Sequence, residues 1–311
     1  MKYIFIVNPI SGKQNNIGQI RGKIAESKYK DNMEVYVTKE KGDATRFVTE
    51  WASTHNEEVR FIACGGDGTL NEVANGAMKA MEAGRDRDSM SISCYPCGSG
   101  NDFVKSFGGA ERFLSVDGLV EAGNKSLDIL KVGDKYSINI VNFGFDTRVI
   151  EVLDSERLKH GHGGKQYYLK GVLVALVDSM KTKCEVYCDG VLMNPEGEAL
   201  LCTLANGQYV GGSFHCAPRA KMDDGLVDVC LVKCVSRGKF VQCVGSYSNG
   251  THLENPKLKS AIRYTQARNI RVEATPGFAY TLDGELVYDT HFELEIVHKA
   301  INFAVPKKVD N

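Results

Sequence analysis

The segment at residues 64–72, CGGDGTLNE, combines three glycines with two carboxylates, Asp67 and Glu72. Glycines let a backbone turn sharply and bring its N–H groups against phosphate oxygens. Asp67 would protrude from such a loop, where it could hold Mg²⁺ through water or orient a reacting hydroxyl. The segment therefore indicates a phosphate-binding loop, although Thr69-x-x-Glu72 also fits a helix capping box, which needs no ligand.

The elements around this loop must hold it at the edge of a sheet. Apolar runs predict strands, and apolar residues at helical spacing predict helices over 44–52 and 70–78. The helix after the loop would turn its positive N-terminal end toward a bound anion. Strand and helix alternate over the first 125 residues, which predicts a doubly wound α/β domain. The expected strands are Tyr3–Val7, Met33–Thr38, Val59–Cys64 and Ser91–Tyr95.

After Ser126 the pattern of expected elements changes to short strands that are separated by Asp-Gly turns. This spacing predicts an antiparallel β-sandwich, interrupted by helices near 165–181 and 237–249. We expect an α/β domain at 1–126, to which the C-terminal tail 300–311 could return. A β-sandwich domain would occupy 127–299.

Two further segments carry carboxylates in turns. Asp283-Gly284-Glu285 lies between apolar runs, and Asp223-Asp224-Gly225 precedes another. Taken alone, both predict ordinary hairpin turns.

Four motifs, in order, resemble the diacylglycerol kinase catalytic-domain family, which also contains sphingosine and ceramide kinases. The GGDGTLNEV string is the most specific, and Asp283-Gly284-Glu285 resembles the family's DGE motif. Asn8-Pro9-x-Ser11-Gly12 resembles the opening nucleotide loop, and residues 96–103 resemble the P-x-G-T/S-x-N-D-F motif. The resemblance runs from about residue 2 to the end of the chain.

The resemblance implies roles for individual residues. Asp67 and Asp102 would organise Mg²⁺ and the phosphates. Glu285 would take the proton from the lipid hydroxyl, with Asp283 in support and Asp67 as the rival base. A further Mg²⁺ would bind the Asp224 carboxylate with the carbonyls of Lys221 and Leu226, a hard-oxygen set that suits this ion. The ATP site would be lined by Asn8, Ser11, Thr38, Gly65, Gly66, Asp67, Gly68, Thr69, Leu70, Asn71, Glu72, Ser99, Asn101 and Asp102.

The resemblance thus implies an ATP- and Mg²⁺-dependent lipid kinase, with diacylglycerol converted to phosphatidic acid as the favoured reaction. The acceptor could instead be a sphingoid base, ceramide or phosphatidylglycerol. An NAD kinase is the more distant alternative, because NAD kinases share a similar GGDG loop.

Composition limits the partners. Lys plus Arg number 38 against 39 for Asp plus Glu, so no global basic field favours nucleic acid. No signal peptide or membrane-spanning run is evident, which predicts a cytoplasmic protein peripheral to the inner face of the membrane. The lysines around the helix near 165–181 are compatible with contact to an anionic bilayer or with a solvated core helix. A homodimer is a further expectation.

Overall fold

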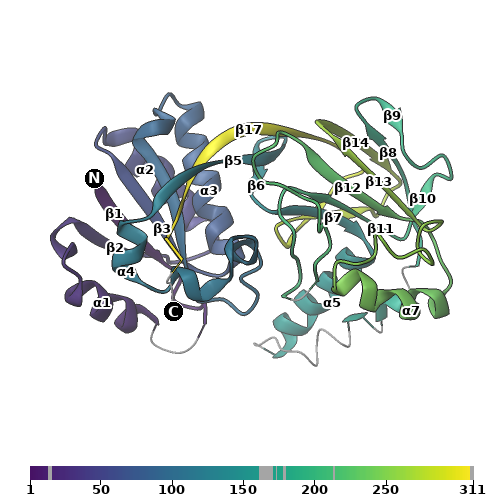
Figure 1. Cartoon of the computed structure of the whole chain (residues 1–311), viewed down its shortest axis with the longest axis horizontal. Helices are drawn as coiled ribbons and strands as arrows, with labels where there is room; N and C mark the ends of the chain where they lie inside the picture. Colours follow the sequence, from purple (N-terminus) through teal and green to yellow (C-terminus); the bar gives the residue numbers. More distant parts are fainter. Residues whose placement is uncertain (13–15, 161–170, 173, 178–179, 213, 309–311) are drawn as a thin grey trace.

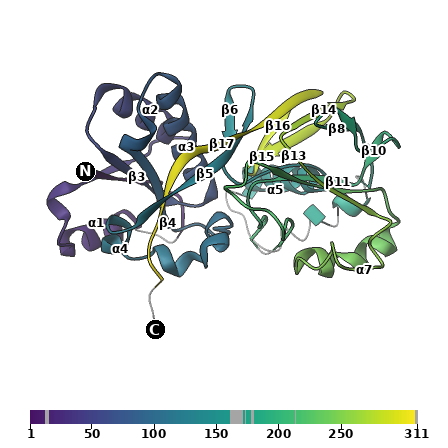
Figure 2. The same cartoon turned by 45° about the horizontal axis from the view of Figure 1, so that its top comes forward.

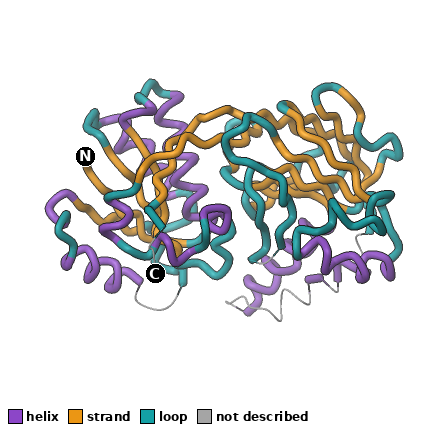
Figure 3. The backbone as a smooth tube through the Cα atoms, in the orientation of Figure 1, coloured by secondary structure: helices purple, strands orange, loops and turns teal. Residues whose placement is uncertain are grey.

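The computed structural model describes residues 1–12, 16–160, 171–172, 174–177, 180–212 and 214–308. The chain forms two lobes side by side, bridged by two long strands (Figure 1). Helices gather in the N-terminal lobe and along one side of the C-terminal lobe (Figure 3). The predicted fold class, a doubly wound α/β domain followed by a β-sandwich, is confirmed. The bridging strands are β5 (Gly123–Val132) and β17 (His291–Val305).

The N-terminal lobe is built on a parallel sheet in the order β2-β1-β3-β4. Every residue of β3 and β4 is buried, as expected for parallel strands covered on both faces, and the buried residues include Arg60 of β3 and Ser91 and Ser93 of β4. Helices α2 and α3 lie on one face of the sheet, and α1 and α4 on the other (Figure 2). The elements are β1 (Lys2–Val7), α1 (Asn16–Glu26), β2 (Met33–Val37), α2 (Asp43–Thr54), β3 (Val59–Gly65), α3 (Asp67–Glu82), β4 (Met90–Pro96) and α4 (Val116–Val120).

The predicted apolar faces of α2 and α3 pack against the sheet and each other. Val48 and Trp51 of α2 are buried, as the helical spacing predicts. Gly76 of α3 allows the close approach, because a Cβ there would lie 2.7 Å from the Thr45 carbonyl oxygen of α2.

The C-terminal lobe is a sandwich of two antiparallel layers. One layer has the order β13-β12-β11-β7-β15-β16, and the other continues the first sheet through β10-β8-β14-β17. The inner faces bury a common core that includes Phe143, Leu204 and Ile270. The elements are β6 (Lys135–Ser137), β7 (Ile140–Gly144), α5 (Phe145–His160), β8 (Thr182–Cys188), β9 (Val191–Leu192), β10 (Glu198–Ala199), β11 (Leu201–Ala205), β12 (Val227–Val232), α7 (Arg237–Ser248), β13 (Ile262–Ala267), β14 (Asn269–Ala274), β15 (Ala279–Leu282) and β16 (Glu285–Tyr288).

Strand β7 alternates its side chains between the two faces of its layer, and all five of its residues are buried. Val141 and Phe143 face the sandwich core, so Asn142 between them lies on the outer face. Phe145 and Leu201 form a second apolar cluster there with Phe240 of α7. The six-stranded layer is therefore covered on both sides, by the other layer and by helices.

Strand β17 belongs to both lobes. Its first half pairs with β14 and β5 in the sandwich. Its register with β5 shifts between Val297 and Ile301, where Lys299 adopts a positive φ of 49°. Beyond this bend, Phe303 pairs with Ile92 of β4 in parallel. The last residues of the chain thus complete the first sheet.

Candidate active site

Three loops meet at the carboxyl ends of β1, β3 and β4, the edge where ligands bind in open α/β sheets. They pack backbone against backbone. A Cβ on Gly98 would lie 2.5 Å from the Cα of Gly66, and a Cβ on Gly12 would lie 2.5 Å from the Cys97 carbonyl oxygen. Glycine is therefore required where the loops touch.

The GGDGT loop leads into α3 with the helix end open. Gly66 is the N-cap and makes no side-chain cap hydrogen bond, so the positive end of α3 is available to an anion. Thr69 accepts a hydrogen bond from Asn8 Nδ2 at 3.2 Å, which ties the first loop to the second. The capping-box reading is wrong, because Thr69 lies inside the helix. Glu72 instead accepts from the N–H groups of Gly42 and Ala44 and so caps α2.

Asp67 fastens the third loop to the second. Its carboxylate accepts from the backbone N–H groups of Asp102, at 3.0 Å, and Phe103, at 3.1 Å. Burial raises the pKa of Asp67, and these two donors oppose the shift. Both oxygens of this predicted catalytic or Mg²⁺-organising group are thus engaged by the chain itself.

Asp102 reaches across to the C-terminal lobe. It accepts from Gly212 N at 2.8 Å and from Lys105 Nζ at 2.6 Å. Lys105 also donates to the Gly212 carbonyl at 2.6 Å. Sequence reasoning missed Lys105 and Gly212. The available signal was a lysine one helical turn after the Asn-Asp-Phe motif.

Asp283 lies in the turn between β15 and β16, with a positive φ of 48°. Its carboxylate accepts from four donors, the hydroxyl of Ser137 and the N–H groups of Ile138, Asn139 and Ile140. Burial raises its pKa to about 6 against the effect of these donors. A carboxylate held this way shapes the turn and is poorly placed to accept a further proton.

The DGE turn contacts the N-terminal lobe at two points. With its amide nitrogen turned toward the acceptors, Asn71 of α3 donates to Asp283 Oδ2 at 2.9 Å. Glu285 forms an ion pair with Lys41, which precedes α2. The structure therefore brings the DGE and GGDGTLNE motifs together, as the resemblance implied.

The remaining predicted ATP-site residues divide into exposed and enclosed groups. Ser99 is exposed at the tip of the third loop, and Gly68 is open to solvent. Thr38 is buried, with its hydroxyl 3.4 Å from the Val7 carbonyl oxygen. Leu70 lies in the apolar core. Asn101 closes its own turn by hydrogen bonds with Gly98, and the backbone of Ser11 donates to Asn8.

The predicted Mg²⁺ loop lies beside the bend of β17. Asp224 Oδ1 accepts from Leu226 N at 3.1 Å, while its Oδ2 has no hydrogen-bond partner in the described part of the chain. This oxygen, with the Lys221 and Leu226 carbonyls, is a donor set that fits a hard cation. The described residues contain no group of three His, Cys, Asp or Glu side chains placed to hold a metal. An ion here would therefore be held by one carboxylate, with backbone carbonyls and water as the other ligands.

Asp128 holds this loop in place and was not identified from the sequence. It is fully buried and accepts from Gly225 N and Lys299 N, both at 2.7 Å. His298 Nδ1 lies 2.8 Å from the same carboxylate. Asn206 links Asp128 to the DGE turn, because its amide donates to the carbonyls of Asp128 and Ile138. The sequence feature that could have identified Asp128 is its position within the apolar run SLDIL, where a charged residue is unexpected.

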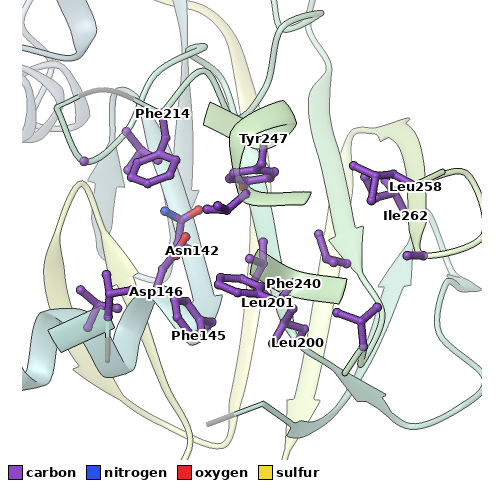
Figure 4. Close-up of a pocket in the computed structure, with 18 of the residues that line it drawn as sticks. Asn142, Phe145, Asp146, Leu200, Leu201, Phe214, Phe240, Tyr247, Leu258 and Ile262 are labelled. Atoms are coloured by element: carbon purple, nitrogen blue, oxygen red, sulfur yellow. The ribbon is translucent and has the colours of Figure 1, made fainter. Parts of the chain in front are cut away.

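An apolar pocket lies between the outer face of the six-stranded layer and the helices (Figure 4). Its walls come from β7, α5, β11 and α7, with Phe214 beside Asn142 (Figure 4). Gly211 also lines it, next in sequence to the Gly212 that binds Asp102. The pocket therefore borders the loop that meets the N-terminal lobe. The apolar lining includes Phe145, Val149, Leu200, Leu201, Phe240, Val244, Leu258 and Ile262.

Two family models match the chain. The diacylglycerol kinase catalytic domain matches residues 2–132, and the YegS C-terminal NAD kinase beta sandwich-like domain matches residues 139–305. The chain belongs to the diacylglycerol kinase catalytic-domain family, with a C-terminal domain of the YegS type. It is thus related to phosphotransferases.

Similar proteins cover almost the same length. A protein named "Probable lipid kinase YegS-like" from Enterobacter sp. (strain 638) is 32% identical over 96% of this chain and 94% of its own. A diacylglycerol kinase from Bacillus subtilis (strain 168) is 29% identical over 97% and 96%. The crystal structure of a diacylglycerol kinase from Bacillus anthracis str. Sterne superposes with a TM-score of 0.74 at 25% identity, covering 98% and 96%.

Proposed function

We propose that this protein transfers the γ-phosphate of ATP to the hydroxyl of a membrane lipid, with diacylglycerol as the acceptor and phosphatidic acid as the product. The observation that carries the proposal is the contact of Gly212 with Asp102. This contact joins the segment that borders the apolar pocket to the third glycine loop, which would hold the phosphates. The names of the relatives support the same class of reaction.

The residues would act mainly by position. In phosphoryl transfer the protein aligns the attacking oxygen and stabilises charge on the phosphates. The open end of α3 and the three glycine loops would hold the phosphates. Asp67 and Asp283 accept several hydrogen bonds from the chain, whereas Glu285 is partly exposed and forms one ion pair. Glu285 is therefore the preferred base for the lipid hydroxyl.

Mg²⁺ would supply positive charge to the phosphates when bound. Asp102 lies between the glycine loops and the C-terminal lobe, and one oxygen of Asp224 has no hydrogen-bond partner among the residues that the structure describes. We assign Asp102 to the nucleotide-bound ion and the Asp224 loop to a separate one.

The acceptor would be taken from a bilayer surface. In the described residues no helix is long and apolar enough to cross a membrane. The side chains of Val177 and Val241 are 68% and 59% exposed near the pocket, with Arg237 of α7 donating to the Val177 carbonyl. These valines and the neighbouring basic residues would form a peripheral contact. The helix expected near 165–181 lies largely outside the described residues.

The test is transfer of labelled γ-phosphate from ATP with Mg²⁺ to a panel of lipids in mixed micelles, beside NAD and a no-acceptor control. Labelled phosphatidic acid is the expected product. Labelling of ceramide, a sphingoid base or phosphatidylglycerol would change the acceptor and keep the mechanism. Labelled NADP would overturn the lipid assignment.

A further inference from the structure

Strand β6 pairs with β5 along one edge and meets helix α3 along the other. In the pairing with β5, Tyr136 lies opposite Lys131. On the side of α3, the side-chain amide of Asn75 takes the place of a neighbouring strand. Its Nδ2 donates to the Tyr136 carbonyl at 2.8 Å, and its Oδ1 accepts from the Tyr136 N–H at 2.9 Å. This is the two-point bond that paired residues of antiparallel strands exchange.

The amide of Asn75 uses both of its protons. The second one goes to the carbonyl of Asn71, one turn earlier in α3, at 2.9 Å. The pair with Tyr136 needs a planar group that carries a donor beside an acceptor. An amide provides this arrangement, whereas leucine has no polar atom and an ionised carboxylate only accepts.

Tyr136 also fastens the β5–β6 hairpin through its side chain. The ring is 2% exposed and lies in the core of the N-terminal lobe. Its hydroxyl donates to Oε1 of Glu82, the last residue of α3, at 2.5 Å. Asn75 and Glu82 are two turns apart, roughly 10 Å along the helix. The hairpin is therefore attached to α3 at two heights, which opposes rotation about either contact.

The segment that follows this pair holds the DGE turn. Residues 137–140 supply the four hydrogen bonds that the Asp283 carboxylate accepts. In the orientation described above, Asn71 donates to Asp283 directly. Two asparagines on successive turns of α3 thus connect the helix to the turn that carries Glu285. The same helix directs its N-terminal end toward the candidate phosphate site.

We propose, given the lipid kinase function above, that Asn75 is a positioning residue. Its pair with Tyr136 fixes the DGE turn, and with it Glu285, relative to the phosphates at the start of α3. The two bridging strands alone would hold this distance poorly, because β17 shifts register at the bend beside Lys299. A misplacement of about 1 Å can cost ~10²-fold in rate. A rigid bridge beside the turn therefore favours transfer to the lipid.

Asn75→Leu tests the bridge, because leucine has a similar volume and makes no hydrogen bond. We expect amide hydrogen exchange at Tyr136 and residues 137–140 to become about tenfold faster, the value of one to two net hydrogen bonds. The kcat for lipid phosphorylation should fall ~10²-fold while the KM for ATP stays unchanged. Val73→Ala is the matched control, since it removes buried methyl groups from the same helix and leaves the pair in place. It should change neither kinetic constant.

Asn75→Asp adds a readout that a merely structural role would not move. The ionised carboxylate has no proton for the Tyr136 carbonyl, whereas the protonated carboxyl again offers a donor beside an acceptor. Burial raises the pKa of the neighbouring Asp283 to about 6, so each rate is divided by that of the unaltered protein at the same pH. The relative kcat of Asn75→Asp should rise about tenfold from pH 8 to pH 5. That of Asn75→Leu should stay constant.

Three results would decide against the bridge. Unchanged exchange in Asn75→Leu would show that the pair does not hold the hairpin. Faster exchange with an unchanged kcat, or a relative kcat of Asn75→Asp that does not respond to pH, would overturn the positioning role. Faster exchange in a protein that phosphorylates no lipid would support the bridge and refute the kinase function alone.

Discussion

Glu285 is the residue whose predicted role depends most on its surroundings. Its ion pair with Lys41 keeps the side chain beside the N-terminal lobe. We expect Glu285→Ala to lower kcat by about 10²–10⁴, the usual contribution of a positioned base, while ATP binding by calorimetry persists. Lys41→Ala removes the ion pair and keeps the carboxylate. If both variants lose the same activity, Glu285 acts through the ion pair and is not the base.

The Asp146 carboxylate lines the apolar pocket and lowers the stability of the fold at neutral pH. Burial raises its pKa from 3.8 to about 6, so the folded state binds more protons than the unfolded state between these values. The contribution of Asp146 to the free energy of unfolding therefore falls as the pH rises from about 4 to 6. It stays at the lower value above pH 6. Two pKa units correspond to up to about 3 kcal/mol.

Asp146→Asn should accordingly be more stable than the unaltered protein at pH 7 and close to it at pH 4. Urea unfolding of both proteins at the two pH values measures the difference. A stability gap that does not change with pH would show that the carboxylate is solvated in the folded state.

At the scale of residues, the sequence showed which side chains carry the chemistry, but it did not show which residues contact one another. The glycines and carboxylates of the GGDGT and DGE motifs were recognised from their types and order. Their hydrogen bonds were not, because partners such as Asn71 and Asp283 lie more than two hundred residues apart. Asn142 gave no signal, since a single amide in a strand looks like an ordinary outward-facing residue.

At the scale of the elements, strand β5 carries a buried aspartate, Asp128, at a position where its sequence pattern predicts an apolar side chain. Asp128 joins β5, the Asp224 loop and the bend of β17 through three donors. Asp128→Ala would leave two backbone N–H groups buried and unpaired, so we expect a loss of about 3 kcal/mol in unfolding free energy. Chemical denaturation checks the value, with exposed Asp289→Ala as the control. A loss below about 1 kcal/mol would mean that water replaces the carboxylate.

The elements themselves were largely predictable. Strands β1 to β4 and helices α2 and α3 are confirmed close to their expected bounds, because buried strands and amphipathic helices leave strong periodic patterns. The capping box expected from Thr69 and Glu72 at the start of α3 is wrong. Glu72 lies on one helix and caps another, and sequence spacing cannot show a contact between neighbouring elements.

For the whole molecule, the Lys105–Gly212–Asp102 contact joins the two lobes at the candidate site. We expect Lys105→Met, which keeps the side-chain length, to reduce kcat/KM about tenfold, since charge-assisted hydrogen bonds are the stronger class. Hydrogen exchange of the 209–212 backbone should also accelerate. Exposed Lys259→Met provides the matched control. Unchanged exchange in Lys105→Met would show that the lobes are held together elsewhere.

The shared strand β17 also constrains how the protein is made. Strand β4 pairs with residue 303 of β17 on its outer side, although the parallel strands on its other side come from the first hundred residues. Phe303 also packs against Phe103 and Phe107, behind the third nucleotide loop. During synthesis the N-terminal lobe would therefore keep an open sheet edge and an unsupported loop until residue 303 has left the ribosome. The loops of the candidate site can reach their final arrangement only after both lobes have been made, so that folding of the first lobe waits for a strand that follows the second.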